Sequence, residues 1–232
     1  MTEQAAYNPL DKTNLGRSVA DAMLGRKPRP LSQLAPFHGA GIYAIYYKGT
    51  FKPYSRLSAL NQDGDPQAPI YVGKAIPEGG RKGGTISAGI STKALFRRLK
   101  EHADSIAAVA KSKIAIADFD CRYLVVDHIW IPLGESLLIA KFAPIWNVLV
   151  DGFGNHDPGS GRYNGFAPRW DVLHPGRAWA AKCRPRDESS SDIARDVASH
   201  LAAAPSLARA KFYAEQRRAE YRVEQQVDSK YN

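Results

Sequence analysis

Apolar positions of the chain gather in three short runs that predict the strands of one small sheet. Gly41–Tyr47 and Pro69–Val72 are rich in β-branched and aromatic residues, which favours buried strands. Cys121–Asp127 predicts a third strand. The polar stretch between the first two runs, residues 48–68, is too long for a hairpin turn and therefore indicates an insertion.

Apolar residues at helical spacing predict the helices that cover this sheet. One helix is expected to begin at Ser91-Thr92, where a hydroxyl can cap the first turn. Leu133–Phe142 predicts a second helix, which ends because Pro144 disfavours the helical conformation at Ala143. With a short helix near Leu15–Leu24 and further helices after the sheet, the order of elements predicts a small α+β sandwich.

Shifts in composition divide the chain into three segments. Residues 1–40 are expected to form a peripheral N-terminal arm with a basic, proline-bearing stretch. Residues 41–150 contain the predicted core, with the insertion at 48–68. Residues 151–232 begin with a loop-rich region of Gly, Pro, His, Asn and Arg and end in one or two helices broken at Pro205.

The charge balance favours a polyanionic partner. The chain has 32 Lys and Arg against 23 Asp and Glu, a net charge of +9, and its 44% hydrophobic residues suffice for a packed core. The N-terminus lacks the pattern of an export signal, and the longest uncharged apolar segment, Phe142–Val150, is about half the length that crosses a bilayer. A nucleic acid is therefore the expected polyanion, and no membrane partner is expected.

The number and spacing of the cysteines exclude a fold that is held together by zinc or by several disulfides. Cys121 and Cys183 are far apart and belong to no Cys-x-x-Cys pair, so they form neither a four-thiolate zinc site nor a disulfide framework. Free thiols of this kind are typical of a reducing compartment. The protein is accordingly expected to be cytoplasmic.

Three short pieces of the chain carry side chains that phosphodiester chemistry needs. Two strand segments place two phenols and an ammonium near one sheet edge, an Arg and a His four residues apart share one helix face, and a Glu and an Asn flank Pro144. Each piece alone is also typical of ordinary packing or of a solvated surface, so only the combination indicates a site. The candidates are Tyr43, Tyr71, Lys74, Arg98, His102, Glu135 and Asn147.

In this order the pieces resemble the signature of the GIY-YIG nucleases. Gly41-Ile42-Tyr43 resembles the GIY strand and Tyr71-Val72-Gly73 the YIG strand, with Val in place of Ile and a longer insertion between them. The Arg and His pair, the Glu and the Asn follow in the family's order, so the resemblance covers about residues 40–148. It implies an α+β core in which helices flank a three-stranded antiparallel sheet, and DNA hydrolysis as the activity.

The residues that would act on the phosphate can be assigned roles. Hydrolysis of a phosphodiester needs a positioned water, a base and cations over the developing charge. Tyr43 is the candidate base, and because an unperturbed phenol has a pKa of about 10, Lys74 or His102 is expected to favour the phenolate. Arg98 is expected to grip the scissile phosphate through its bidentate fork, and Tyr71 to bind a phosphate oxygen or orient the water.

The remaining two candidates concern the leaving group and the scaffold. Glu135 is expected to hold one divalent ion, Mg²⁺ with Mn²⁺ as a substitute, near the leaving 3′ oxygen. Asn147 is assigned to structure, with its amide tying the loop after Pro144 to the sheet. The expected products carry a 5′-phosphate and a 3′-hydroxyl.

The segments around the core favour the type II restriction endonucleases within this family. The chain is too short for the added domains of repair members, and its cysteines exclude the zinc module of structure-specific eukaryotic members. Gly152–Arg162 resembles the group that cuts the palindrome CCGCGG, and a palindrome implies a homodimer on double-stranded DNA. A companion DNA methyltransferase is then expected, though not as a stable partner. A repair or structure-specific nuclease and a catalytically inactive DNA-binding protein stay open as alternatives.

Basic residues outside the core are the candidates for further DNA contacts. Arginine forks can read guanines in the major groove, and basic loop residues can track phosphates. The C-terminal helices, Asp192–Gln226, and the insertion at 48–68 are both candidates for the dimer interface. The candidate DNA-binding residues are Arg162, Arg169, Arg177, Arg81 and Lys82.

Overall fold

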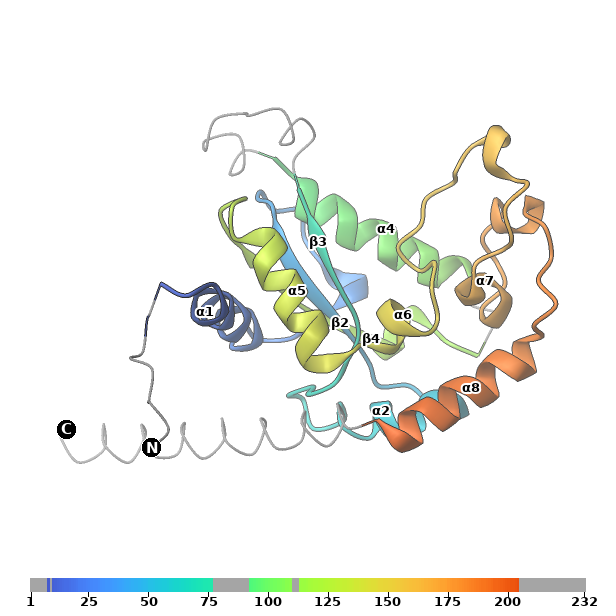
Figure 1. Cartoon of the computed structure of the whole chain (residues 1–232), viewed down its shortest axis with the longest axis horizontal. Helices are drawn as coiled ribbons and strands as arrows, with labels where there is room; N and C mark the ends of the chain where they lie inside the picture. Colours follow the sequence, from blue (N-terminus) through green and yellow to red (C-terminus); the bar gives the residue numbers. More distant parts are fainter. Residues whose placement is uncertain (1–7, 9, 77–91, 110–112, 205–232) are drawn as a thin grey trace, which may run out of the picture.

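A four-stranded antiparallel sheet with the strand order β1-β4-β2-β3 forms the centre of the molecule (Figure 1). The computed structural model describes residues 8, 10–76, 92–109 and 113–204. Three strands overlap those predicted, although β3 ends three residues later and β4 lies two residues earlier than expected, and β1, which pairs with β4, adds a fourth that the sequence did not indicate. The strands are β1 (Arg29–Pro30), β2 (Gly41–Tyr47), β3 (Pro69–Ala75) and β4 (Phe119–Val125).

Helices cover both faces of this sheet. On β2 the side chains alternate between the faces: Ile42 lies close to Gly134 of α5, while Tyr43 contacts His102 of α4. Every residue of β2 is therefore buried, and α1 packs on α5 on the first of these faces. The α-helices are α1 (Lys12–Leu24), α2 (Ser55–Ser58), α4 (Ala94–Ala108), α5 (Ile131–Phe142), α6 (Ile145–Val148), α7 (Arg169–Leu173) and α8 (Ser190–Ala203).

Short 3₁₀ turns connect these elements. They are η1 (Leu31–Gln33), η2 (Lys52–Tyr54), η4 (Ile116–Asp118), η5 (Ser160–Arg162) and η6 (Ala180–Lys182). Among the described residues, no helix is both long and apolar enough to cross a membrane.

Three helices begin at other residues than predicted, and α1 starts at Lys12 rather than near Leu15. Helix α4 begins at Ala94 rather than at Ser91-Thr92, although the Thr92 hydroxyl still accepts a hydrogen bond from the Ala94 amide at 3.2 Å. Helix α5 begins two residues before Leu133, because a proline fits the first turn of a helix. Its end is as expected: Ala143 leaves the right-handed region, with φ of 42°, directly before Pro144.

The insertion at 48–68 is closed at its base by a single asparagine. The Asn61 amide donates to the carbonyls of Tyr47 and Ala68, at 2.8 and 2.9 Å, and its oxygen accepts from the amides of Gln67 and Ala68. The last residue of β2 is thereby tied to the residue before β3, so the insertion leaves their pairing intact. Its two short helices, η2 and α2, pack against α8.

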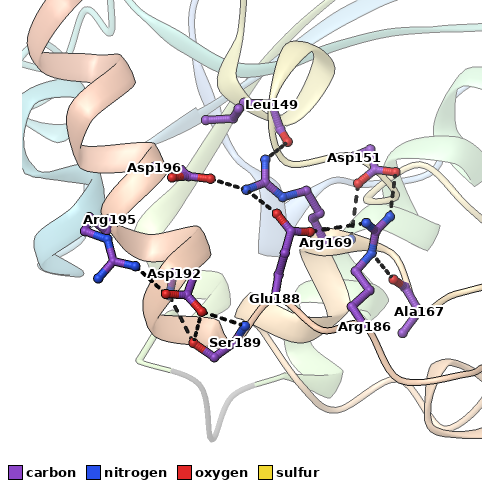
Figure 2. A network of polar contacts seen from close by, with 10 residues as sticks. All are labelled: Leu149, Asp151, Ala167, Arg169, Arg186, Glu188, Ser189, Asp192, Arg195 and Asp196. Atoms are coloured by element: carbon purple, nitrogen blue, oxygen red, sulfur yellow. Dashed lines mark hydrogen bonds and ion pairs between the residues drawn. The ribbon is translucent and has the colours of Figure 1, made fainter.

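The region after residue 150 packs on the core through buried aromatic rings, and an ion-pair network joins its own segments (Figure 2). Trp170 of α7 is fully buried and meets Trp146 of α6 edge to face. Ser189 and Asp192 form a capping box that starts α8. As expected, α8 ends before Pro205, and residues 205–232 lie outside the described residues.

Candidate active site

The candidate residues gather around the edge strand β3. Successive strand residues point to opposite faces, so Tyr71 faces α4 and Lys74 faces α5. The site therefore wraps over the strand rather than lying on one face of the sheet. Gly73 of β3 leaves room for the phenol of Tyr43, its cross-strand neighbour on β2. A Cβ at residue 73 would clash with this phenol.

A tyrosine and a histidine form a buried pair on the α4 side. The Tyr43 hydroxyl lies 2.7 Å from His102 Nε2, and both side chains are almost fully buried. Burial raises the pKa of Tyr43 well above its usual value, with the nearby Tyr71 adding to the effect and the Arg98 cation opposing it. Burial also lowers the pKa of His102 well below 6.5, and Arg98 acts in the same direction. Both partners are thus neutral at pH 7.

The expectation that Lys74 or His102 supplies a cation to Tyr43 is corrected by this geometry. His102 is neutral because it is desolvated, and Lys74 Nζ pairs with Glu135 at 2.5 Å on the opposite face of β3. The cation that favours the Tyr43 phenolate is Arg98.

Arg98 lies in a groove of about 370 Å³ that Lys74 also lines. Its Nη2 donates to the Gly154 carbonyl at 2.6 Å, and its Nη1 donates to Glu101 at 3.1 Å and lies 2.5 Å from His156 Nε2. Burial raises the pKa of Tyr71 from its usual value, and the Arg98 cation opposes this. Tyr43, Tyr71, Arg98 and His102 thus form one connected cluster.

Three residues of this cluster were missed by sequence reasoning. Phe153 stacks on the His102 ring at 4.5 Å, and Gly154 and His156 contact Arg98. They lie in a stretch that composition marks only as loop. Gly-Phe-Gly at 152–154 was the available signal, since glycines permit close backbone approach.

Asn147 holds the outer side of β3. Its amide oxygen accepts from the Val72 amide and its amide nitrogen donates to the Val72 carbonyl, both at 2.8 Å. The side chain replaces a neighbouring strand at the open edge, and it ties the segment after Pro144 to the sheet as the sequence predicted.

Two of the arginines predicted to read bases are instead used inside the protein. Arg177 is 6% exposed and directs its guanidinium at Asp171 and at backbone carbonyls of residues 152–155. Arg169 donates to the Leu149 carbonyl and pairs with Asp196 and Glu188 (Figure 2). Both guanidiniums are thus engaged by groups of the protein itself in this structure, and base reading by either one stays a prediction.

The other predicted DNA contacts are not tested by the described structure. Arg162 is the last residue of η5. Arg81 and Lys82 lie outside the described residues.

Fold and site together define a GIY-YIG nuclease domain: an antiparallel sheet flanked by helices, with both tyrosines and the Arg, His, Glu and Asn side chains at one edge. A model of the Eco29kI GIY-YIG domain family, a restriction endonuclease family, matches residues 35–201, and the chain belongs to this family. It is accordingly a restriction-type nuclease, a class that acts on DNA. Among curated proteins, none matches the chain.

Glu135 is the carboxylate that could hold a metal at this site. GIY-YIG restriction nucleases generally use divalent metals. Within the described residues, no three His, Cys, Asp or Glu side chains come together as a ready-made metal cluster. A single carboxylate still fits Mg²⁺, because this ion usually keeps several waters and takes only one or two carboxylates plus substrate phosphates.

Proposed function

We propose that the protein is a type II restriction endonuclease that hydrolyses both strands of DNA and leaves 5′-phosphate and 3′-hydroxyl ends. The observation that carries this proposal is the neutral Tyr43–His102 pair beside Arg98, with Glu135 across the same edge strand. Arg98 and Lys74 line one groove, the buried Tyr43–His102 base lies next to Arg98, and the Glu135 carboxylate pairs with Lys74. This is the set of groups that hydrolysis of a phosphodiester requires.

The Tyr43–His102 pair acts as the base in this proposal. In the tautomer with unprotonated Nε2, His102 accepts the Tyr43 proton while the phenol oxygen takes a proton from the attacking water. The hydroxide oxygen bonds to phosphorus, the bond to the 3′ oxygen breaks, and that oxygen takes a proton from solvent water to give the 3′-hydroxyl. Because both partners start neutral, no buried phenolate has to exist before the substrate binds.

Arg98 and Tyr71 bind the phosphate, and Glu135 serves the leaving group. Arg98 places positive charge on the non-bridging oxygens, and the Tyr71 hydroxyl donates to one of them. Glu135, oriented by Lys74, is the ligand for Mg²⁺, for which Mn²⁺ can substitute. When bound, the ion supplies positive charge at the leaving 3′ oxygen.

Glu135→Gln tests the metal role, since it keeps the side-chain size and removes the charge. We expect plasmid cleavage in MgCl₂ to be lost while DNA binding in a gel-shift assay is retained. Asp104→Asn on α4 is the matched control, because this exposed carboxylate pairs with Lys100 on the same helix. Cleavage by Glu135→Gln at the wild-type rate would remove the metal assignment.

The target and the assembly are further parts of the proposal. The resemblance of Gly152–Arg162 supports the palindrome CCGCGG, which two subunits of a homodimer would cut, with a companion methyltransferase protecting the host site. A cytoplasmic location follows the same restriction role.

Sequencing the ends of fragments from phage DNA identifies the site and stagger, and sedimentation measures the subunit number. Discrete fragments are expected. A smear would indicate a repair-type or structure-specific nuclease, and binding without cutting an inactive DNA-binding protein.

A further inference from the structure

The loop at residues 152–156 reaches from the C-terminal region into the catalytic cluster. The Gly154 carbonyl and the His156 ring both contact the guanidinium of Arg98, on different nitrogens. Glu101, one turn along α4, takes the remaining contact on Nη1. Three acceptors from two elements thus fix the plane of one guanidinium.

This loop is itself rigidly held, by the buried Arg177. The Arg177 guanidinium donates to the carbonyls of Gly152, Phe153 and Asn155 at 2.8 to 3.2 Å, and it pairs through two nitrogens with Asp171. All five of its N–H donors are used in these contacts. The backbone that presents Gly154 and His156 to Arg98 is therefore fixed by buried hydrogen bonds.

The guanidinium is also sandwiched between two indole rings. Its central carbon lies 4.5 Å from the ring centroid of Trp170 and 4.7 Å from that of Trp179. Stacking of this kind suits the flat, weakly hydrated arginine head group. The clamp on the loop thus belongs to the packed interior of the C-terminal region.

The fit between the loop and the site is close. A Cβ at residue 154 would lie 2.6 Å from the Tyr71 hydroxyl and 3.2 Å from Arg98 Nη2. Only glycine therefore lets the backbone carbonyl approach Arg98 at this point. Phe153 packs against both Tyr71 and His102, at 5.0 and 4.5 Å between ring centroids.

We propose that His156 is a positioning residue of the nuclease, which orients Arg98 for the scissile phosphate. The inference rests on the proposed role of Arg98 as the phosphate-binding cation. An arginine side chain has several rotatable bonds, and a small displacement of a catalytic group costs about 10²-fold in rate. His156 accepts a hydrogen bond from Nη1 and so aims the other nitrogens of the fork at the cluster.

The charged groups around His156 come from α4 and β3. Arg98 and Glu101 of α4 face the ring, at 2.5 and 3.6 Å from Nε2, and Lys74 of β3 and Arg97 of α4 line the same groove. A guanidinium nitrogen carries only N–H donors, so the ring nitrogen that lies 2.5 Å from Arg98 Nη1 meets it as the acceptor. The side chain is 63% exposed, so its contribution lies in the Arg98 contact rather than in core packing.

The test compares His156→Ala with His156→Gln in single-turnover cleavage of plasmid DNA in MgCl₂. Alanine removes the acceptor, so we expect the rate constant to fall about 10- to 100-fold, with less than a threefold change in the DNA concentration for half-maximal rate. Glutamine keeps an acceptor oxygen and should restore most of the rate. His200→Ala on α8 is the matched control and should cut like the wild type.

A measurement without DNA separates this inference from the function itself. In the ¹⁵N NMR spectrum of the wild type, the Arg98 guanidinium should show slowed rotation. His156→Ala should make this rotation faster, and His156→Gln should leave it slow. An Arg98 signal that is the same in all three proteins would overturn the positioning role, even if the wild type does not cut DNA. Equal rates for wild type and His156→Ala, or equal losses for both variants, would also overturn it while leaving the nuclease assignment intact.

Discussion

At the scale of single residues, the chemistry of the site depends on how burial changes two ordinary side chains. Sequence reasoning placed Tyr43 on a strand and His102 on a helix, and it offered His102 as a cation beside the Tyr43 phenol. Desolvation reverses this, because a fully buried imidazole without an acidic partner prefers the neutral form. The sign of a charge in a buried site depends on its surroundings, which a sequence of residue types does not contain.

Removing the Tyr43 hydroxyl tests the base directly. Tyr43→Phe keeps the buried ring and its contacts with Tyr71 and His102, so the fold should persist. The single-turnover rate should fall about 10²- to 10⁴-fold, the usual contribution of a general base. Unfolding should also become easier by about 1 to 3 kcal/mol, because His102 loses its partner.

Tyr123→Phe is the matched control for this prediction. Tyr123 lies opposite Tyr43 on the neighbouring strand β4 and stacks on Phe37. Its variant should cut at the wild-type rate. Near wild-type cutting by Tyr43→Phe would show that the Tyr43 hydroxyl has no catalytic role.

At the scale of elements, the sequence predicted the existence of three strands better than their ends, and it did not predict the fourth strand. Both ends of the strand Gly41–Tyr47 were predicted correctly, because an unbroken run of β-branched and aromatic residues strongly favours a buried strand. β3 continues three residues beyond the predicted Val72, since Gly73 and Lys74 have little strand preference and are held by pairing with β2. β1 was missed because two residues that include a proline carry no strand signal.

The arginines after residue 150 show where residue type alone is insufficient. A guanidinium that binds the protein's own carbonyls and one that reads guanine need the same five donors. Only the buried position of Arg177 distinguishes them. The segment 151–204 thus helps to build the site, a role that its loop-like composition did not predict.

Breaking the Arg177 clamp should destabilise the protein rather than change its DNA preference. Arg177→Met leaves the buried Asp171 carboxylate without its partner and three carbonyls without a donor. We expect a loss of about 3 to 5 kcal/mol in urea unfolding. The double variant with Asp171→Leu should recover part of this loss. An unchanged free energy of unfolding with altered fragment patterns would instead return Arg177 to base reading.

At the scale of the whole molecule, the net charge of +9 comes from basic residues with different roles: some form ion pairs within the fold, and others are exposed to a partner. Arg122, Arg169 and Arg177 are paired within the fold, and Lys74 and Arg98 line the groove of the candidate site. The overall basicity correctly indicated a nucleic acid. It did not indicate which cations meet DNA, because that depends on which guanidiniums the fold uses for itself.

Two buried histidines make the stability of the whole molecule dependent on pH. Burial lowers the pKa of His102 well below 6.5 and that of His174, which lies 2.7 Å from the Tyr54 hydroxyl, to about 3. In the unfolded chain both should titrate near 6.5. Above pH 6.5 both states are neutral, so the stability gained from neutral burial is fully present. As the pH falls below 6.5, the unfolded chain takes up protons that the folded protein excludes, and stability is lost.

Urea unfolding at a series of pH values measures this effect. Between pH 6.5 and 5.5 each histidine should cost about 1 kcal/mol, so the pair should lower the free energy of unfolding by about 2 kcal/mol. His174→Gln removes one of the two groups while an amide can still meet Tyr54, so it should halve the slope in this range. A free energy of unfolding that stays constant from pH 6.5 to 5.5 would mean that the two imidazoles titrate alike in both states, and that the neutral Tyr43–His102 base does not exist.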